Sequence, residues 1–175
     1  MEFVPLEIDG TYGIKEIIKS DIRGDLIRVW EKNSLLLDFH LIQSSIVTNP
    51  ILGTLRGLHY QLEPFSENKI IQCVTGMVFD VIVDLRESSK TYGRFLGLNI
   101  GPTSEYLGLL APAGCAHGYL TMKPNSTLIY FMDKEFSDKH ARGIIWNDPK
   151  FAIPWPIEPK LISDRDNLWP NFITH

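Results

Sequence analysis

Paired cysteines, excess positive charge and long apolar runs are all scarce in this chain, and each shortage excludes a class of protein. Cys73 and Cys115 are the only cysteines among 175 residues, which is too few for a disulfide framework. The net charge of -4 offers no general attraction for nucleic acid or an anionic membrane, although a local basic cluster could still bind a small anion. No apolar run is long enough to span a membrane, and the N-terminal MEFVPLEIDG lacks the apolar region of a signal peptide. We therefore expect a cytoplasmic protein with reduced thiols that binds neither nucleic acid nor membrane.

Helical periodicity is also scarce, and short apolar runs separated by glycine, proline and asparagine take its place. This pattern predicts an all-β fold, a sandwich, jelly roll or barrel, in one domain spanning residues 1–175. The expected strands are 39–48, 54–61, 69–76, 77–85, 94–100, 106–112, 118–122, 126–136 and 142–148. Only residues 9–21 and 161–169 could hold a helical turn or two.

The run GMVFDVIVDLR at 76–86 alternates well as a strand and places Asp80 and Asp84 on the same face. One interpretation is that this face is exposed to solvent. The other is that an aspartate faces a pocket and orients a histidine.

His59 and His117 both lie in apolar strand sequence within two residues of a glycine. Each could be a hydrogen-bonded core residue, but other polar groups on neighbouring expected strands favour a site. Those groups are Arg56, Lys69, Asp80 and Tyr130. The set suits proton transfer at carbon: an imidazole removes a proton, a cation holds the enolate oxygen, and a tyrosine protonates the opposite face.

Two rival chemistries fit the residues less well. A metal-binding barrel commonly uses an H-x-H pair, and GLHYQ supplies only His59, so we expect no metal. Cys115 and His117 share one face of a strand at spacing i, i+2, which would allow a Cys–His nucleophile. A small buried cysteine packed in the core is the alternative.

Several segments occur in a recognisable order: GTLRGLHYQ, NKIIQCVTGMVFDVIVDLR, TYGRF, APAGCAHGYLT, LIY, IIWNDP and IPWP. From about Asp21 to Asp166 the chain resembles the dTDP-4-dehydrorhamnose 3,5-epimerase family of cupin-like jelly rolls (double-stranded β-helices). The resemblance implies a homodimeric, cofactor-independent isomerase of a nucleoside-diphospho-4-keto sugar. It would invert C3, C5 or both through enolate intermediates.

The resemblance also implies a role for each catalytic candidate. His59 of RGLH would be the general base, with Asp166 of SDRD as its orienting carboxylate. Lys69 would stabilise the enolate oxygen, and Tyr130 of LIY would be the acid on the opposite face.

Substrate binding would involve a second set of residues. Arg56, Gln61 and His117 would line the pocket, with Asp80 paired to His117. Arg23 of RGD would reach a nucleotide phosphate across a dimer.

Arg56 and His59 differ in parity, so strict alternation would place them on opposite faces of their strand. Gly57 could host a β-bulge that turns both side chains toward one pocket.

The chain departs from the family pattern where the sugar or nucleotide would bind. Asp25 and Leu26 replace part of an aromatic run, Ser45 stands where asparagine is usual, and Glu135 and Phe136 replace a tyrosine pair. These changes leave open the nucleotide base, the sugar and the number of inverted carbons. A single-centre epimerase, a ketoisomerase and a non-catalytic sugar-binding jelly roll are the alternatives.

Overall fold

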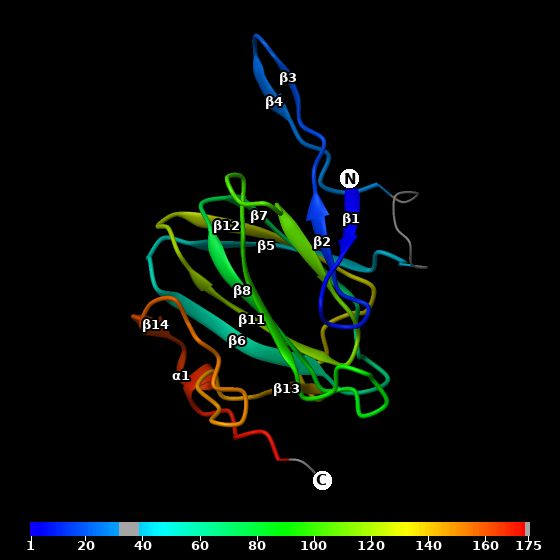
Figure 1. The fold of residues 1–175 in the computed structure, drawn as a ribbon, viewed down its shortest axis with the longest axis vertical. Helices are drawn as coiled ribbons and strands as arrows, with labels where there is room; N and C mark the ends of the chain where they lie inside the picture. The colour runs from blue at the N-terminus through cyan, green and yellow to red at the C-terminus, as the bar shows by residue number, and fades with distance from the viewer. Residues whose placement is uncertain (32–38, 174–175) are drawn as a thin grey trace.

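The structure is a computed structural model that describes residues 1–31 and 39–173, and its main feature is a pair of facing antiparallel sheets (Figure 1). The first sheet, in spatial order, is β1 (Glu2–Pro5), β2 (Tyr12–Lys15), β10 (Gly108–Ala111), β7 (Lys69–Thr75), β12 (Ser126–Met132) and β5 (Gln43–Asn49). The second is β13 (Ala141–Gly143), β6 (Thr54–Gln61), β11 (Cys115–Thr121), β8 (Val78–Asp84) and β9 (Phe95–Ile100). This arrangement confirms the predicted all-β, cupin-like jelly roll.

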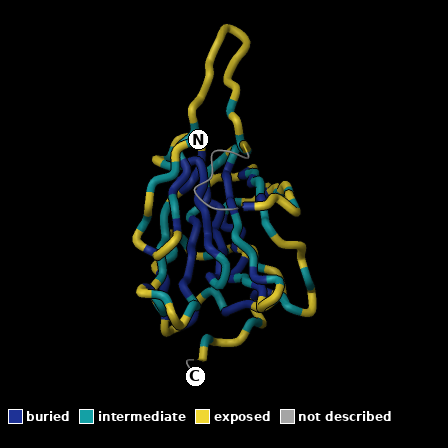
Figure 2. The backbone as a smooth tube through the Cα atoms, turned by 90° about the vertical axis from the view of Figure 1, so that its right-hand side faces the viewer, coloured by how far each residue is buried: buried dark blue, intermediate teal, exposed yellow. Residues whose placement is uncertain are grey.

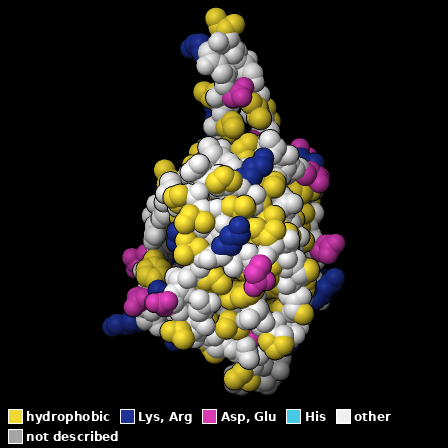
Figure 3. Space-filling view, turned by 90° about the vertical axis from the view of Figure 1, so that its left-hand side faces the viewer, with side chains coloured by type: hydrophobic (Ala, Val, Ile, Leu, Met, Phe, Trp, Pro, Cys, Tyr) yellow, Lys and Arg dark blue, Asp and Glu magenta, His cyan; other side chains and the backbone are white. Residues whose placement is uncertain are grey.

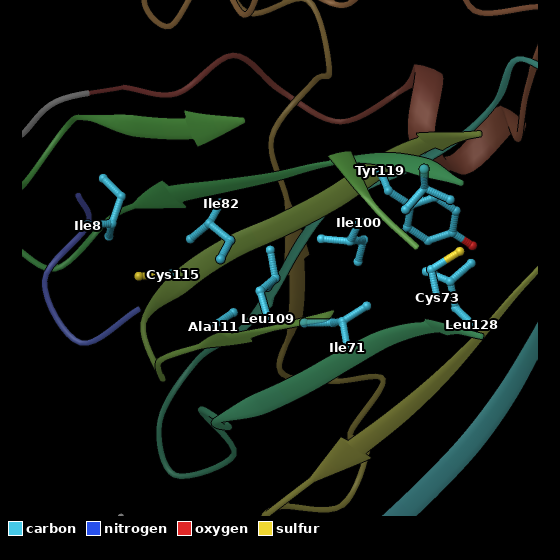
Figure 4. Close-up of a cluster of buried hydrophobic side chains, with 11 residues drawn as sticks. Ile8, Ile71, Cys73, Ile82, Ile100, Leu109, Ala111, Cys115, Tyr119 and Leu128 are labelled. Atoms are coloured by element: carbon cyan, nitrogen blue, oxygen red, sulfur yellow. The ribbon is translucent and has the colours of Figure 1, made fainter. Parts of the chain in front are cut away.

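The core lies between the two sheets because the alternating apolar residues of both inner faces meet there. Ile71 and Leu109 contribute from the first sheet, and Ile82 and Ile100 from the second; all four side chains are buried (Figure 4). A second cluster covers the outer face of the second sheet, where Phe151 and neighbours from residues 144–153 pack on it. The two central strands of this sheet, β8 and β11, are therefore buried along almost their whole length, and Figure 2 shows buried backbone at the centre of the molecule.

The local predictions had mixed outcomes. The strand expected at 54–61 is β6, with the same bounds. The helical turn expected within 161–169 is confirmed as α1 (Asp164–Asn167), which follows the short strand β14 (Leu161–Ile162). The helical turn expected within 9–21 is wrong, because that segment forms β2 and the start of a hairpin.

The exposed interpretation of the face that carries Asp80 and Asp84 is also wrong. Both side chains are fully buried on β8. Asp84 accepts hydrogen bonds from Arg86, Ser89 and Thr91, so its charge is satisfied within the fold.

One hairpin leaves the body of the molecule. It consists of β3 (Lys19–Asp21) and β4 (Gly24–Leu26) and projects beyond the sheets (Figure 1). Every residue of its two strands is exposed, and the space-filling view shows apolar side chains on it (Figure 3). Ile22 at its tip and Leu26 on its second strand are among these exposed apolar residues.

Among the helices in the described part of the chain, none is long and apolar enough to cross a membrane.

Candidate active site

A cavity of about 410 Å³ opens between the two sheets, and most of the predicted site residues line it. Its walls come from β5, β7 and β12 of one sheet and from β6 and β11 of the other, with α1 at the rim. The predicted residues that it gathers are Arg56, His59, Gln61, Lys69, His117, Tyr130 and Asp166.

His59 and Asp166 form a hydrogen-bonded pair at this cavity. The Nε2 atom of His59 lies 2.6 Å from Oδ1 of Asp166, and the carboxylate is buried while the imidazole is 42% exposed. A carboxylate accepts hydrogen bonds, so Nε2 carries the hydrogen and the lone pair of the neutral imidazole lies on Nδ1. The pair therefore has the arrangement of a general base held by an orienting acid.

Local structure at the C-terminal end brings Asp166 to this position. β14 pairs in parallel with β6, and Ser163 caps α1 by accepting a hydrogen bond from the backbone N–H of Asp166. Burial raises the pKa of Asp166, but hydrogen bonds from His59, the N–H of Gly57 and Trp169 outweigh it, so the pKa falls below its ordinary value. The carboxylate is therefore ionised at neutral pH.

The bulge predicted at Gly57 is confirmed by the strand register. His117 of β11 pairs with His59, but Tyr119 pairs with Arg56, so β6 contains one residue more than its partner across this step. Gly57 has φ of +130°, and a Cβ atom there would lie 2.5 Å from Cα of Gly118. The bulge lets Arg56 and His59 line the same cavity.

Lys69 supplies a cation to the cavity and is held by an acidic neighbour. Its Nζ atom lies 3.0 Å from Oε1 of Glu67, and both side chains are largely buried. Gln61 donates to the other oxygen of Glu67, and its own carbonyl accepts from the N–H of Ser137. Gln61 thereby fixes the segment that orients Lys69.

Tyr130 comes from β12, in the sheet opposite His59. Burial, followed by the neighbouring phenol of Tyr119, raises the pKa of Tyr130 well above its ordinary value. The phenol is therefore protonated at neutral pH and can act as an acid.

His117 and Asp80 form a second, deeper pair. Nε2 of His117 lies 2.9 Å from each carboxylate oxygen of Asp80, and both residues are buried. Burial raises the pKa of Asp80 against the opposing effect of His117. Asp80 itself does not line the cavity, so it holds His117 from behind.

Arg23 is the predicted residue that neither lines this cavity nor bonds to a residue that does. It lies on the β3–β4 hairpin, where its side chain is 86% exposed and pairs with Asp21. Within one chain it is separate from the other site residues.

Sequence reasoning missed several residues that line the cavity. They are Tyr119, whose hydroxyl donates a hydrogen bond to Asn49, the acidic Glu67, and three polar residues near the rim: Ser163, Arg142 and Arg165. Arg165 lies inside SDRD, so proximity to Asp166 was an available signal. The sequence held no such signal for Arg142, because β13 reaches the cavity only by pairing with β6.

The structure gives one finding on each of the two rival chemistries. No group of three or more histidine, cysteine, aspartate or glutamate side chains could hold a metal within residues 1–31 and 39–173. Cys115 packs in the core, and burial raises the pKa of its thiol to about 12, so the core interpretation of this cysteine is confirmed.

Comparison with known proteins agrees with the fold and identifies the family. The family model described as dTDP-4-dehydrorhamnose 3,5-epimerase matches residues 5–173. The protein of that name from Sinorhizobium fredii is 37% identical over 155 residues, covering 86% of this chain and 79% of the relative. The one from Shigella flexneri is 42% identical over 121 residues, 69% of this chain and 66% of that protein.

Solved structures give the same result. The dTDP-4-dehydrorhamnose 3,5-epimerase of Bacillus anthracis, with TDP and pyrophosphate bound, has a TM-score of 0.92 at 31% identity and covers 98% of this chain and 99% of that one. A 3'-monoepimerase from Streptomyces bikiniensis, in complex with dTDP-quinovose, has a TM-score of 0.86 at 30% identity and covers 95% and 86% of the two chains.

The fold and the site thus define a cupin-like jelly roll whose cavity between the sheets gathers two histidine–carboxylate pairs, a lysine and a tyrosine. The chain belongs to the dTDP-4-dehydrorhamnose 3,5-epimerase family. It is an isomerase, specifically an epimerase.

Proposed function

We propose that this protein inverts carbons next to the 4-keto group of a thymidine-diphosphate-linked 4-keto-6-deoxyhexose by removing and returning protons. The observation that carries this proposal is the His59–Asp166 pair facing a cavity whose opposite wall holds Tyr130. Two solved structures support the substrate class: the Streptomyces bikiniensis epimerase named above, with dTDP-quinovose bound, and a further neighbour, a 4-keto-6-deoxy sugar epimerase of Streptomyces spheroides.

The roles follow from the chemistry of each group. His59 takes the proton from carbon while Asp166 stabilises the imidazolium that forms. Lys69 offsets the charge on the enolate oxygen. Tyr130 then protonates the carbon from the other sheet, which produces inversion because the proton arrives on the opposite face. No step requires a metal or a cofactor.

Binding requires other residues. Arg56 and His117 bind the sugar, with Asp80 fixing His117 and Gln61 fixing the Glu67–Lys69 pair. Arg142 and Arg165 at the rim give the diphosphate a positive surround.

The test is incubation with the thymidine-linked 4-keto sugar in deuterated water, followed by NMR. Deuterium with inverted configuration at C3, at C5 or at both is the expected result, and the labelled positions identify the inverted carbons. Tyr130→Phe should still exchange deuterium but invert far more slowly, since His59 can reprotonate the original face. Absence of both exchange and inversion in the wild-type protein, across a panel of nucleotide-linked 4-keto sugars, would rule out this function.

The working unit that we propose is a homodimer of 1–175 epimerase domains in the cytoplasm. Exposed Ile22 and Leu26 on the β3–β4 hairpin support a partner at this hairpin, and the two free, buried cysteines support a reducing compartment. In this dimer Arg23 reaches a phosphate in the partner's cavity.

Subunit mixing tests the arrangement. Arg23→Ala and His59→Ala should each be weakly active, whereas mixed dimers of the two should regain one intact site, which combines His59 of one chain with Arg23 of the other. If mixed dimers form but activity does not recover, Arg23 does not act across the dimer. A monomer with full activity in light scattering would contradict the dimer itself.

A further inference from the structure

Tyr119 borders the acid Tyr130, yet the roles given above leave its hydroxyl unused. It projects from β11, two residues after His117, and only 1% of it is exposed. It lines the cavity, and Tyr130 packs against the core cluster that contains it. A second phenol beside the acid calls for a chemical explanation, because a phenylalanine would fill the same apolar space without a polar atom to satisfy.

Asn49 holds the hydroxyl of Tyr119 in place. This residue ends β5 and is 1% exposed. Its Oδ1 atom accepts a hydrogen bond of 3.2 Å from the Tyr119 hydroxyl and one of 3.0 Å from Nε of Arg56. Its Nδ2 atom donates to the carbonyl of Ser126, at the start of the strand that carries Tyr130, and this bond fixes the orientation of the amide.

The hydroxyl of Tyr119 therefore has a fixed direction. Because it gives its own hydrogen to Asn49, its oxygen can act only as an acceptor toward the phenol of Tyr130, which lines the same cavity and packs against the same core cluster. The oxygen of Asn49, in turn, has a second donor in Arg56.

We propose that Tyr119 is a positioning residue that stabilises the phenolate left on Tyr130 after it protonates the substrate carbon; the proposal rests on the proposed function. When Tyr130 loses its proton, the hydroxyl of Tyr119 turns from Asn49 and donates to the new oxyanion. Because Arg56 still donates to Asn49, the turn leaves no buried acceptor without a partner. The hydroxyl of Tyr119 can turn because Oδ1 of Asn49 accepts from both Tyr119 and Arg56 and keeps the bond from Arg56.

The step balances in atoms and charge. The O–H bond of Tyr130 breaks and its electron pair remains on the phenolate oxygen. The proton joins the carbon, whose new C–H bond uses the electron pair of the enolate, and the ketone is restored. His59 still holds the proton removed in the first step, and exchange with solvent resets both groups.

The experiment is a double-mutant cycle of Tyr119→Phe and Tyr130→Phe, assayed with the thymidine-linked 4-keto-6-deoxyhexose in deuterated water. Tyr119→Phe should slow inversion about 10- to 100-fold, the scale of one hydrogen bond to a charged group, while deuterium exchange stays within about twofold of wild type. In the Tyr130→Phe background Tyr119→Phe should not slow inversion further, because that background cannot form the phenolate that Tyr119 stabilises.

A matched control separates this effect from packing. Tyr106→Phe removes a hydroxyl from a residue packed on the same core cluster but outside the cavity, and it should leave both rates unchanged. Thermal denaturation checks folding of each variant. If Tyr119→Phe does not fold, Asn49→Ser tests the same contact from its other side, with the same expected lack of additivity with Tyr130→Phe.

Three results would overturn the inference. Tyr119→Phe could invert at the wild-type rate, it could lower exchange and inversion equally, or its effect could add fully to that of Tyr130→Phe. Each would leave the proposed function standing. Wild-type protein that neither exchanges nor inverts any 4-keto sugar would overturn the proposed function, and this inference with it.

Discussion

Nε2 of His59 and Oδ1 of Asp166 lie 2.6 Å apart although 107 residues separate them in the chain. The contact depends on a short parallel strand, β14, which lies beside β6 and delivers α1 to the mouth of the cavity. The base is therefore built by tertiary structure, and each partner can be tested separately.

His59→Ala should abolish both deuterium exchange and inversion, since no enolate forms without the base. Loss of a general base costs about 10²–10⁴-fold in rate. Asp166→Asn should lower both rates less, because it weakens the orientation and basicity of the imidazole but leaves it in place. His140→Ala, which alters a histidine that does not line the cavity, serves as the control. Wild-type rates in His59→Ala would direct the search for the base to His117.

Lys69→Met should depress deuterium exchange because the enolate oxygen loses its cation. The expected loss is about 10²–10³-fold, as for removal of one oxyanion donor. Glu67→Gln should accompany it, so that no buried carboxylate is left without its ion pair. Lys90→Met, at an exposed position, controls for the change of residue type. Unchanged exchange in the double variant would mean that another group holds the oxyanion.

Gly57→Ala should destabilise the protein and disable the site together. The backbone there has φ of +130°, and the new Cβ would meet Cα of Gly118 at 2.5 Å, which forces β6 and β11 apart. Gly24→Ala is the matched control, since Gly24 has φ of +124° but no atom within 4 Å of such a Cβ. Backbone strain alone costs about 1–3 kcal/mol, so Gly57→Ala should lose clearly more than Gly24→Ala in chemical denaturation. Equal losses would mean that the close approach of the strands does not matter.

Asp84 should control the stability of the fold in acid. Burial raises its pKa, but hydrogen bonds from Arg86, Ser89 and Thr91 outweigh it and place the pKa well below its ordinary value. The stabilisation is fully present above the unfolded pKa of about 3.9 and is lost as the pH falls toward the folded pKa. Asp84→Asn should therefore cost at least about 2 kcal/mol at neutral pH, and the difference from wild type should shrink below about pH 4.

Urea unfolding at a series of pH values measures this difference. Asp138→Asn is the control, since its side chain is 83% exposed and its ion pair with Arg165 is long at 3.7 Å. A loss in Asp84→Asn that does not vary with pH would show that shape and not charge is responsible.

Activity should survive exhaustive chelation, because the histidines of the cavity are already bonded to Asp166 and Asp80. The measurement is the rate of inversion after treatment with EDTA and removal of the chelator. A loss that one divalent metal restores would favour a metal-dependent mechanism instead.

The sequence alone predicted the features that depend on local pattern. The short apolar run at 54–61, bounded by turn signals, predicted β6, and the mismatch in parity between Arg56 and His59 correctly placed a bulge at Gly57. The assignment of roles to Asp166 and Lys69 came from the resemblance to a family, since no spacing along the chain links either of them to His59.

Only the tertiary structure decided which faces are buried and which distant groups meet. The run 78–84 alternates like a strand with one face in solvent, yet residues 144–153 cover one side of its sheet and the opposite sheet covers the other. Asn49 and Tyr119 meet although 70 residues separate them, because β5 and β11 belong to facing sheets. Pleat and turn preferences act between neighbours in sequence, whereas these contacts depend on how whole sheets pack. Most strands of the two sheets could therefore be predicted from the chain, but β1 to β4, β14 and the cavity between the sheets could not.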